Sequence, residues 1–255
     1  MPTTATAAKP TTIDAADVAR FSAIAAEWWD VGGKFAPLHR LNPVRIGYLR
    51  EQVIRHFSAR SGVDGQSATP FKNLSLVDIG CGGGLIAEPM ARLGASVTGI
   101  DASETNIRVA ALHAENGGLT IDYRATTAED LAEAGQQFDV VLALEIIEHV
   151  ADVELFFDAL RALVKPGGIL ILSILNRTAK SYAMGIVGAE YVLRWLPRGT
   201  HSWKQFLRPS EMARALTARG FTVADTCGLT FSPLTWKFAL NPRDLDVNYM
   251  MVAMR

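Results

Sequence analysis

The chain has 255 residues, of which 49% are hydrophobic, and a formal net charge of −1. This length suits one α/β domain with a large core, and the balanced charge gives no electrostatic reason to expect nucleic acid as a partner. Two cysteines cannot build a disulfide framework or a cysteine zinc cluster, and no run of about 18 apolar residues is present that could cross a bilayer. We therefore expect a cytoplasmic protein.

The amino-terminal region is predicted to be a tail followed by helices. Residues 1–12 are small and polar, so we expect them to be disordered. Apolar residues at helical spacing predict helices over Ile13–Trp29 and Asn42–Phe57. Residues 13–60 would thus form a helical cap on the rest of the protein. No linker divides residues 13–255 into two domains.

From Leu74 onward, predicted strands alternate with predicted helices. This pattern indicates a doubly wound, mostly parallel sheet of seven strands. The predicted strands are Leu74–Gly80, Ser96–Ile100, Ile121–Ala125, Phe138–Leu144, Ile169–Leu175, Phe221–Asp225 and Asp246–Met254. The predicted helices are Leu85–Leu93, Ser103–Asn116, Asp152–Val164 and Pro209–Arg219.

A glycine-rich turn follows the first predicted strand. Gly80, Gly82 and Gly84 let the backbone approach a ligand closely, and the next helix offers free N–H groups at its start. Asp101 ends the second predicted strand, where a carboxylate can accept both hydroxyl groups of a ribose. The spacing predicts a site for a cofactor that contains adenosine.

Two cofactors fit this turn. Residues 82–87 match the dinucleotide fingerprint, which favours a nicotinamide dehydrogenase. Asp78, however, places a carboxylate beside the turn, where it would repel a pyrophosphate and attract a cation. S-adenosylmethionine carries an amino group, a sulfonium and no phosphate, so Asp78 favours that cofactor. An alternative role for Asp78 is to anchor the amides of the loop.

The combined motifs over residues 74–175 resemble the class I S-adenosylmethionine-dependent methyltransferases. They are VDIGCGGG, Asp101, Ala128-Glu129, FDVVLALEIIEHV and LVKPGGILILS. Over residues 20–255 the chain is similar to the ubiquinone biosynthesis O-methyltransferase family, through FSAIAAEWWDVGGKFAPLHRLNPVRIGYL, EIIEHV, NRTAKSYAMGIVGAEYVLRWLPRGTH and DVNYMM. That resemblance implies O-methylation of polyprenylated catechols and of demethylubiquinol.

The resemblance also implies a set of cofactor contacts. In that family Arg45, Gly80, Asp101 and Leu144 would touch the cofactor, and Asp78, Gly82, Ala128 and Glu129 complete our predicted set. Arg45 would pair with the carboxylate of the cofactor, since a guanidinium group binds carboxylates with two hydrogen bonds. Without the resemblance, the sequence favours Arg45 as a surface residue of an amphipathic helix, and Leu144 could equally be a core residue.

The sequence EIIEH follows the fourth predicted strand. If a helix starts there, Glu145, Glu148 and His149 share one face and can hold a divalent cation such as Mg²⁺, as the resemblance also implies. Glu145 and His149 are the predicted catalytic residues, and His149 could instead act as a general base on a phenol. A third reading is that the two glutamates form a solvated helix start.

Residues 177–198 form the predicted insertion after the fifth strand of the sheet. Tyr182, Ile186, Ala189, Leu193 and Leu196 lie on one helical stripe, and four basic residues accompany Glu190. This composition is typical of a helix that lies on an anionic membrane surface, although a lid over the pocket or a core helix would also fit. We therefore expect residues 177–200 to form a lid or to attach the protein peripherally to the inner face of a bacterial membrane. The expected substrate is a polyprenylated phenol. A ubiquinone-biosynthesis complex is a further expected partner. A non-catalytic lipid-binding subunit is the remaining alternative.

Overall fold

The computed structural model describes residues 10–61, 63–192, 199 and 202–255 of the chain. Its strands form a single sheet in the order β3-β2-β1-β4-β5-β8-β6-β7. The strands are β1 Ser75–Ile79, β2 Ser96–Asp101, β3 Asp122–Ala125, β4 Phe138–Leu144, β5 Val164–Leu175, β6 Thr222–Ser232, β7 Lys237–Asn241 and β8 Asn248–Met254. The first five are parallel to one another, and β8, β6 and β7 pair antiparallel.

The predicted doubly wound, mostly parallel sheet is therefore confirmed, and the described residues contain eight strands where seven were predicted. The strand that the prediction missed is β7, which pairs with an extension of β6 to Ser232. Its sequence KFALN is short and exposed at the edge of the sheet, so it lacks the continuous apolar run that identifies the buried strands.

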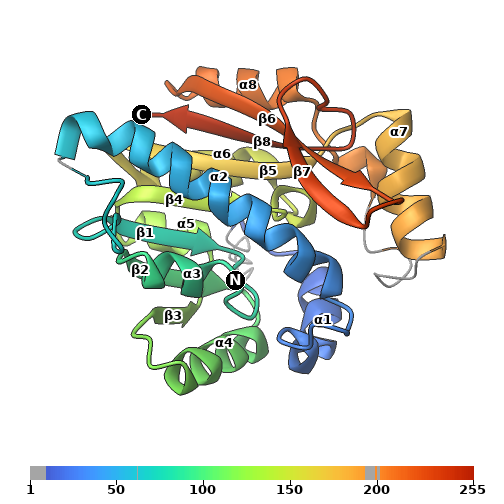
Figure 1. Ribbon diagram of the computed structural model, residues 1–255, viewed down its shortest axis with the longest axis horizontal. Helices are drawn as coiled ribbons and strands as arrows, with labels where there is room; N and C mark the ends of the chain where they lie inside the picture. Colours follow the sequence, from blue (N-terminus) through green and yellow to red (C-terminus); the bar gives the residue numbers. More distant parts are fainter. Residues whose placement is uncertain (1–9, 62, 193–198, 200–201) are drawn as a thin grey trace, which may run out of the picture.

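Helices cover both faces of the sheet (Figure 1). The α-helices are α1 Ala15–Ala23, α2 Ala36–Ser61, α3 Ala87–Arg92, α4 Glu104–Asn116, α5 Ala128–Glu133, α6 Val153–Leu163, α7 Ala179–Ser181 and α8 Pro209–Ala218. The remaining helical turns are η1 Ala25–Glu27, η2 Ile147–His149, η3 Tyr182–Val192 and η4 Trp203–Gln205.

The core has one layer on each face of the sheet. Apolar residues of α5, α6 and α8 pack on one face, and those of α2 and α3 pack on the other. Helix α2 starts six residues before its predicted beginning, so that Pro43 lies inside it. It is anchored across the sheet by Tyr48 and Gln52, which both donate hydrogen bonds to Asp225 of β6, at 2.7 and 2.9 Å.

The start of the chain is closer to the core than predicted. Residues 1–9 of the predicted disordered tail lie outside the described residues, but Thr12 is buried and its backbone oxygen accepts a hydrogen bond from Ala151 N at 2.9 Å. The tail therefore does not extend to Thr12. Asp14 then caps α1, with its carboxylate accepting from Ala16 N at 2.9 Å, which is why a helix begins there.

The predicted amphipathic segment is described as far as Val192. In η3, Ile186 is buried while Tyr182 and Val187 are exposed. Leu193, Leu196 and two of the four basic residues lie outside the described residues. No helix in the described ranges is long and apolar enough to span a membrane.

Candidate active site

The glycine turn between β1 and α3 has the backbone that the sequence predicts. Gly80, Gly82 and Gly84 have φ angles of +72°, +52° and +88°, a region that glycine adopts at little cost. A Cβ atom at Gly82 would also overlap the ring of Trp28, which comes from the end of η1. The turn is thus closed on one side by the amino-terminal cap.

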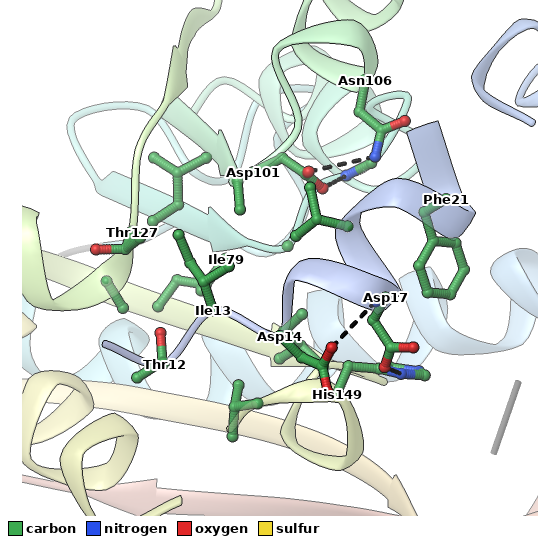
Figure 2. Close-up of a pocket in the computed structure, with 18 of the residues that line it drawn as sticks. Thr12, Ile13, Asp14, Asp17, Phe21, Ile79, Asp101, Asn106, Thr127 and His149 are labelled. Carbon is green, nitrogen blue, oxygen red and sulfur yellow. Dashed lines mark hydrogen bonds and ion pairs between the residues drawn. The ribbon is translucent and has the colours of Figure 1, made fainter. Parts of the chain in front are cut away.

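Asp101 stands at the carboxyl end of β2 and is held firmly. Its carboxylate accepts hydrogen bonds from Gly82 N at 3.1 Å, Ser103 N at 2.8 Å and Asn106 Nδ2 at 3.2 Å. Figure 2 shows Asp101 and Asn106 facing each other on the wall of a cavity. The carboxylate therefore connects the glycine turn to the start of α4 and faces the space that a ribose would need.

Asp78 and Arg45 place two opposite charges inside the site. Both side chains are buried, and Arg45 reaches the site from α2, where its guanidinium donates to Asn42 Oδ1. Burial raises the pKa of Asp78 to about 7, although the charge of Arg45 opposes this rise. One oxygen of Asp78 accepts no hydrogen bond from a described residue. A buried acceptor of this kind fits a cationic ligand group.

Glu145 occupies an unusual backbone position just after β4. Its φ angle is +53°, a left-handed conformation that is costly for a residue other than glycine. Ser173 Oγ donates to its carboxylate at 2.7 Å, and Asn248 Nδ2 donates at 3.0 Å. These two contacts come from β5 and β8, and they hold the carboxylate at the edge of the sheet.

The prediction that Glu145, Glu148 and His149 share one helical face is wrong. Because Glu145 is left-handed, no helix starts there, and the turn η2 spans only Ile147–His149. Among the described residues, no group of three or more His, Cys, Asp and Glu side chains is arranged to hold a metal ion. The three predicted ligands therefore do not form one metal site in this structure.

Glu148 is nevertheless electrostatically unusual. It is 1% exposed, and neither oxygen of its carboxylate accepts a hydrogen bond from a described residue. Burial and the neighbouring charge of Glu145 raise its pKa well above the ordinary value. Two carboxylates so close together either share a proton or require a cation.

His149 is held by the first helix of the chain. Its Nδ1 atom lies 2.9 Å from Asp17 Oδ2, and the edge of its ring meets Phe21 with 5.3 Å between centroids. Figure 2 shows Asp17 of α1 directed toward His149. Because a carboxylate only accepts, Nδ1 carries the hydrogen and Nε2 is the basic nitrogen.

Ala128 and Glu129 follow β3, as predicted, and they begin α5, a helix that was not predicted. The carboxylate of Glu129 is already engaged by other residues. It accepts from Thr12 N and Thr12 Oγ1, each at 2.8 Å, and from Thr11 Oγ1 at 3.2 Å. Ala128 lines the first cavity and Glu129 does not. Glu129 thus fastens the amino-terminal segment beside the cavity.

Two cavities meet at this edge of the sheet. The first is lined by Asp101, Asn106 and Ala128, and the second is lined by Asp78, Arg45 and Leu144. Five residues line both cavities: Phe21, Trp28, Gly80, Glu145 and His149. A ligand that extends from Asp101 toward Arg45 would pass directly beside His149 and Glu145.

Several site residues were not predicted from the sequence. They are Thr12, Asp17, Asn106, Ser173 and Asn248. Asn106 lies three residues after Ser103, which caps the start of α4. This spacing is a local signal from which the position of Asn106 beside the site could have been predicted. The others contact the site across 28 to 132 positions of sequence, and no local pattern indicates such contacts.

Comparisons with a family model and with solved structures agree with the fold described above. A family model described as a methyltransferase domain matches residues 48–226. A magnesium protoporphyrin IX methyltransferase from Synechocystis, solved with bound S-adenosylhomocysteine, has the same fold, with a TM-score of 0.55 and 21% identity over 92% of this chain and 99% of that one. A Thermotoga maritima methyltransferase gives a TM-score of 0.60 at 17% identity over 92% and 98% of the two chains. Fold and family model together define a class I S-adenosylmethionine-dependent methyltransferase.

Closer relatives show which family of methyltransferases the chain resembles. A ubiquinone biosynthesis O-methyltransferase of Mesorhizobium japonicum is 55% identical over 95% of both chains. One from Ruegeria pomeroyi is 53% identical over 97% of this chain and 98% of that one. The chain belongs to the ubiquinone biosynthesis O-methyltransferase family and is an S-adenosylmethionine-dependent enzyme. The dehydrogenase and the non-catalytic subunit considered above are therefore both wrong.

The glycine turn supplies a first testable prediction. We expect Gly82→Ala to lower the free energy of unfolding by at least about 1 kcal/mol, because alanine is disfavoured at positive φ and its methyl group would overlap Trp28. S-adenosylmethionine affinity should fall at least tenfold, by the same order of energy. Gly47→Ala in α2 is the matched control, since a Cβ there meets nothing within 4 Å. Thermal melts and calorimetric titration measure both quantities, and equal affinities in the two variants would contradict the prediction.

Proposed function

We propose that the enzyme transfers the methyl group of S-adenosylmethionine to a catechol-type hydroxyl of polyprenylated ubiquinone precursors, including a polyprenyl dihydroxybenzene or benzoate and demethylubiquinol. One observation carries this proposal: His149 and Glu145 lie where the two cavities meet. The first cavity suits the adenosine of the cofactor, and the second, lined largely by apolar side chains, suits an acceptor with a hydrocarbon tail.

The cofactor contacts follow from charge. Asp101 would accept the ribose hydroxyls, while Gly80 and Gly82 let the cofactor pass close to the backbone. Arg45 would bind the carboxylate of the methionine portion, and Asp78 would bind its amino group. This pose directs the sulfonium toward the junction of the cavities.

His149 would act as the base in the transfer. A phenol has a pKa of about 10, so its ionisation at pH 7 costs roughly 4 kcal/mol. His149 Nε2 would take the hydroxyl proton while the oxygen attacks the methyl carbon and the sulfur–methyl bond breaks, which leaves S-adenosylhomocysteine. Asp17 fixes the Nδ1–H tautomer and stabilises the imidazolium that forms.

A divalent cation fits part of this site. The buried carboxylate of Glu148, without a donor and beside Glu145, has the charge that such an ion would balance. Mg²⁺ is commonly held by one or two carboxylates and completed by water or substrate oxygens. Glu145 and Glu148 would hold the ion, and His149, engaged by Asp17, would stay a base. When bound, the ion would lower the pKa of the catechol.

The carboxylate pair supplies a second prediction. Because burial raises the pKa of Glu148, its ionised form destabilises the fold, and this cost grows as the pH rises above the ordinary glutamate value of about 4.5. We expect Glu148→Gln to raise the melting temperature at pH 8 without magnesium and to leave it unchanged at pH 4. Magnesium should raise the melting temperature of the unmodified enzyme and not that of Glu148→Gln. Identical melting curves with and without magnesium would contradict the cation site.

Attachment to an anionic membrane through residues 177–198 also belongs to this proposal. The apolar side chains Tyr182 and Val187 are exposed on η3. Arg177 pairs with Glu211, and Lys180 pairs with Asp244 and Asp246 at 3.1 and 3.2 Å. Both charges are therefore partly neutralised, so attachment would depend mainly on the apolar side chains. A location at the inner face of the bacterial membrane, and contact with other enzymes of the pathway, would follow from such attachment.

Methyl transfer to a short-chain prenyl catechol tests the proposed function. We expect a methyl ether and S-adenosylhomocysteine in equal amounts, detected by mass spectrometry. The matched acceptor is the same compound with one hydroxyl already methylated and the other removed, which should give no product. Failure of the catechol to react while S-adenosylmethionine binds tightly would overturn the assigned acceptor.

A further inference from the structure

The β6–β7 hairpin carries an apolar tip in open solvent. Leu234, in the turn between the strands, is 94% exposed, the highest value among the large hydrophobic residues of the described chain. Trp236 is 45% exposed and Leu240 is 37% exposed. A leucine and a tryptophan together at the tip of a hairpin are costly in water unless a partner covers them.

The hairpin tip has an internal framework of aromatic rings. Phe231 meets Trp236 edge-on, with 5.9 Å between centroids, and lies 5.0 Å from Phe238. Arg40 of α2 lies over the Trp236 ring at 5.4 Å. The tip is therefore a shaped surface with Leu234 at its end, and a tryptophan beside a cation is favoured at a membrane interface.

The charged side chains of the hairpin itself are all basic. Residues 227–243 contain Lys237 and Arg243 and no acidic residue, and residues 31–50 of the adjacent cap and α2 also lack acids. The acids that border these two stretches are Asp225, which accepts hydrogen bonds from Tyr48 and Gln52, Asp244, which pairs with Lys180, and Asp30 and Glu51. An apolar tip within a basic surrounding is complementary to anionic lipid headgroups over a hydrocarbon layer.

The hairpin also lies beside the cavity for the acceptor. Phe238 of β7 and Gly185 of η3 both line the second cavity, and Figure 1 shows β7 on the same side of the molecule as α7. Exposed apolar residues of η3 and η4, namely Tyr182, Val187 and Trp203, belong to this region of the chain. The hairpin and the insertion thus stand on two sides of one cavity.

We propose that the tip of the β6–β7 hairpin, through Leu234 and Trp236, docks into the surface of an anionic lipid bilayer beside the acceptor cavity. This inference rests on the proposed lipid acceptor, and it assigns the membrane contact to a second element besides the insertion. A second copy of the chain is a poorer occupant, since Pro233 and Pro242 flank β7 and Lys237 begins it, all features that discourage pairing at a sheet edge.

Vesicle sedimentation with the full chain tests this docking. The vesicles contain phosphatidylcholine with one third phosphatidylglycerol, and pure phosphatidylcholine vesicles serve as the comparison. We expect Leu234→Ser to weaken binding to the anionic vesicles about tenfold, since burying a leucine side chain contributes at least that factor. Leu112→Ser on α4, where the side chain is 60% exposed, is the matched control and should bind normally.

A spectroscopic measurement separates insertion from an altered fold. Brominated lipids should quench tryptophan fluorescence in the unmodified enzyme, and Trp236→Phe should measurably lower that quenching. Unchanged vesicle binding by Leu234→Ser, or a change only in its oligomeric state, would overturn the docking. So would failure of the unmodified enzyme to bind anionic vesicles.

The acceptor assay distinguishes this inference from the proposed function. Leu234→Ser should methylate a water-soluble catechol at the unmodified rate, because Leu234 lines neither cavity. Turnover without vesicle binding would support the proposed methyl transfer and contradict the proposed membrane docking. Absence of turnover in the unmodified enzyme would contradict the proposed acceptor, regardless of the result of the vesicle-binding measurement.

Discussion

We expect His149→Asn to lower the turnover number for a catechol by about 10² to 10⁴, the usual contribution of a general base. Asparagine fills a similar space but cannot take the phenolic proton. Affinity for S-adenosylmethionine should change little, because the predicted cofactor contacts, Arg45 and Asp101, lie on other elements. Single-turnover rates and calorimetric titration separate the two effects.

The contact with Asp17 makes this prediction specific. Asp17→Asn removes the carboxylate that holds His149 Nδ1 but keeps the volume of the side chain. We expect its turnover to fall about tenfold to a hundredfold, because the imidazolium that forms during the transfer would lose its stabilising charge. Arg20, which pairs with Asp17 at 2.5 Å, gives the control Arg20→Lys, which should keep near-normal turnover. Normal turnover in both His149→Asn and Asp17→Asn would contradict a base at this position.

The second large effect concerns Asp78 and the pH dependence of cofactor affinity. Without cofactor, burial raises the pKa of Asp78 to about 7, so the carboxyl group is largely protonated below that pH. S-adenosylmethionine keeps its positive charges there, since an α-amino group has a pKa of about 7.7–8.0. Binding must then ionise Asp78 and release a proton, and affinity should fall by up to about tenfold for each pH unit below 7.

Asp78→Asn should remove that dependence. We expect its affinity to be lower by about ten- to a hundredfold at pH 8, the usual value of a charge-assisted hydrogen bond, and nearly flat from pH 8 to pH 6. Asp101→Asn is the matched comparison, because it should weaken binding at every pH while keeping the slope below 7. Titrations in two buffers with different ionisation enthalpies count the protons released. A slope that persists in Asp78→Asn would assign the proton to another group.

Some of this site could be predicted from local sequence. The glycines and Asp101 belong to one strand–turn–helix–strand unit, and their spacing alone places them together. The alternation of apolar strands and helices likewise predicted the parallel sheet, which brings the carboxyl ends of β1, β2 and β4 to one edge.

The EIIEH segment shows where local reasoning failed. Helical spacing predicted one face for Glu145, Glu148 and His149, but Ser173 and Asn248 hold Glu145 in a left-handed conformation instead. Those partners come from β5 and β8. Their effect on the backbone of Glu145 cannot be predicted from the five residues of EIIEH alone.

The sequence by itself determined the cofactor class, the fold and the position of the ligand edge, because each depends on residues close together in the chain. Only the tertiary structure decided which side chains act together. Asp17 reaches His149 across 132 positions, and Asn248 reaches Glu145 across 103. Such pairs form when α1 lies beside His149 and β8 inserts between β5 and β6, and neither placement is encoded within one short stretch of the chain.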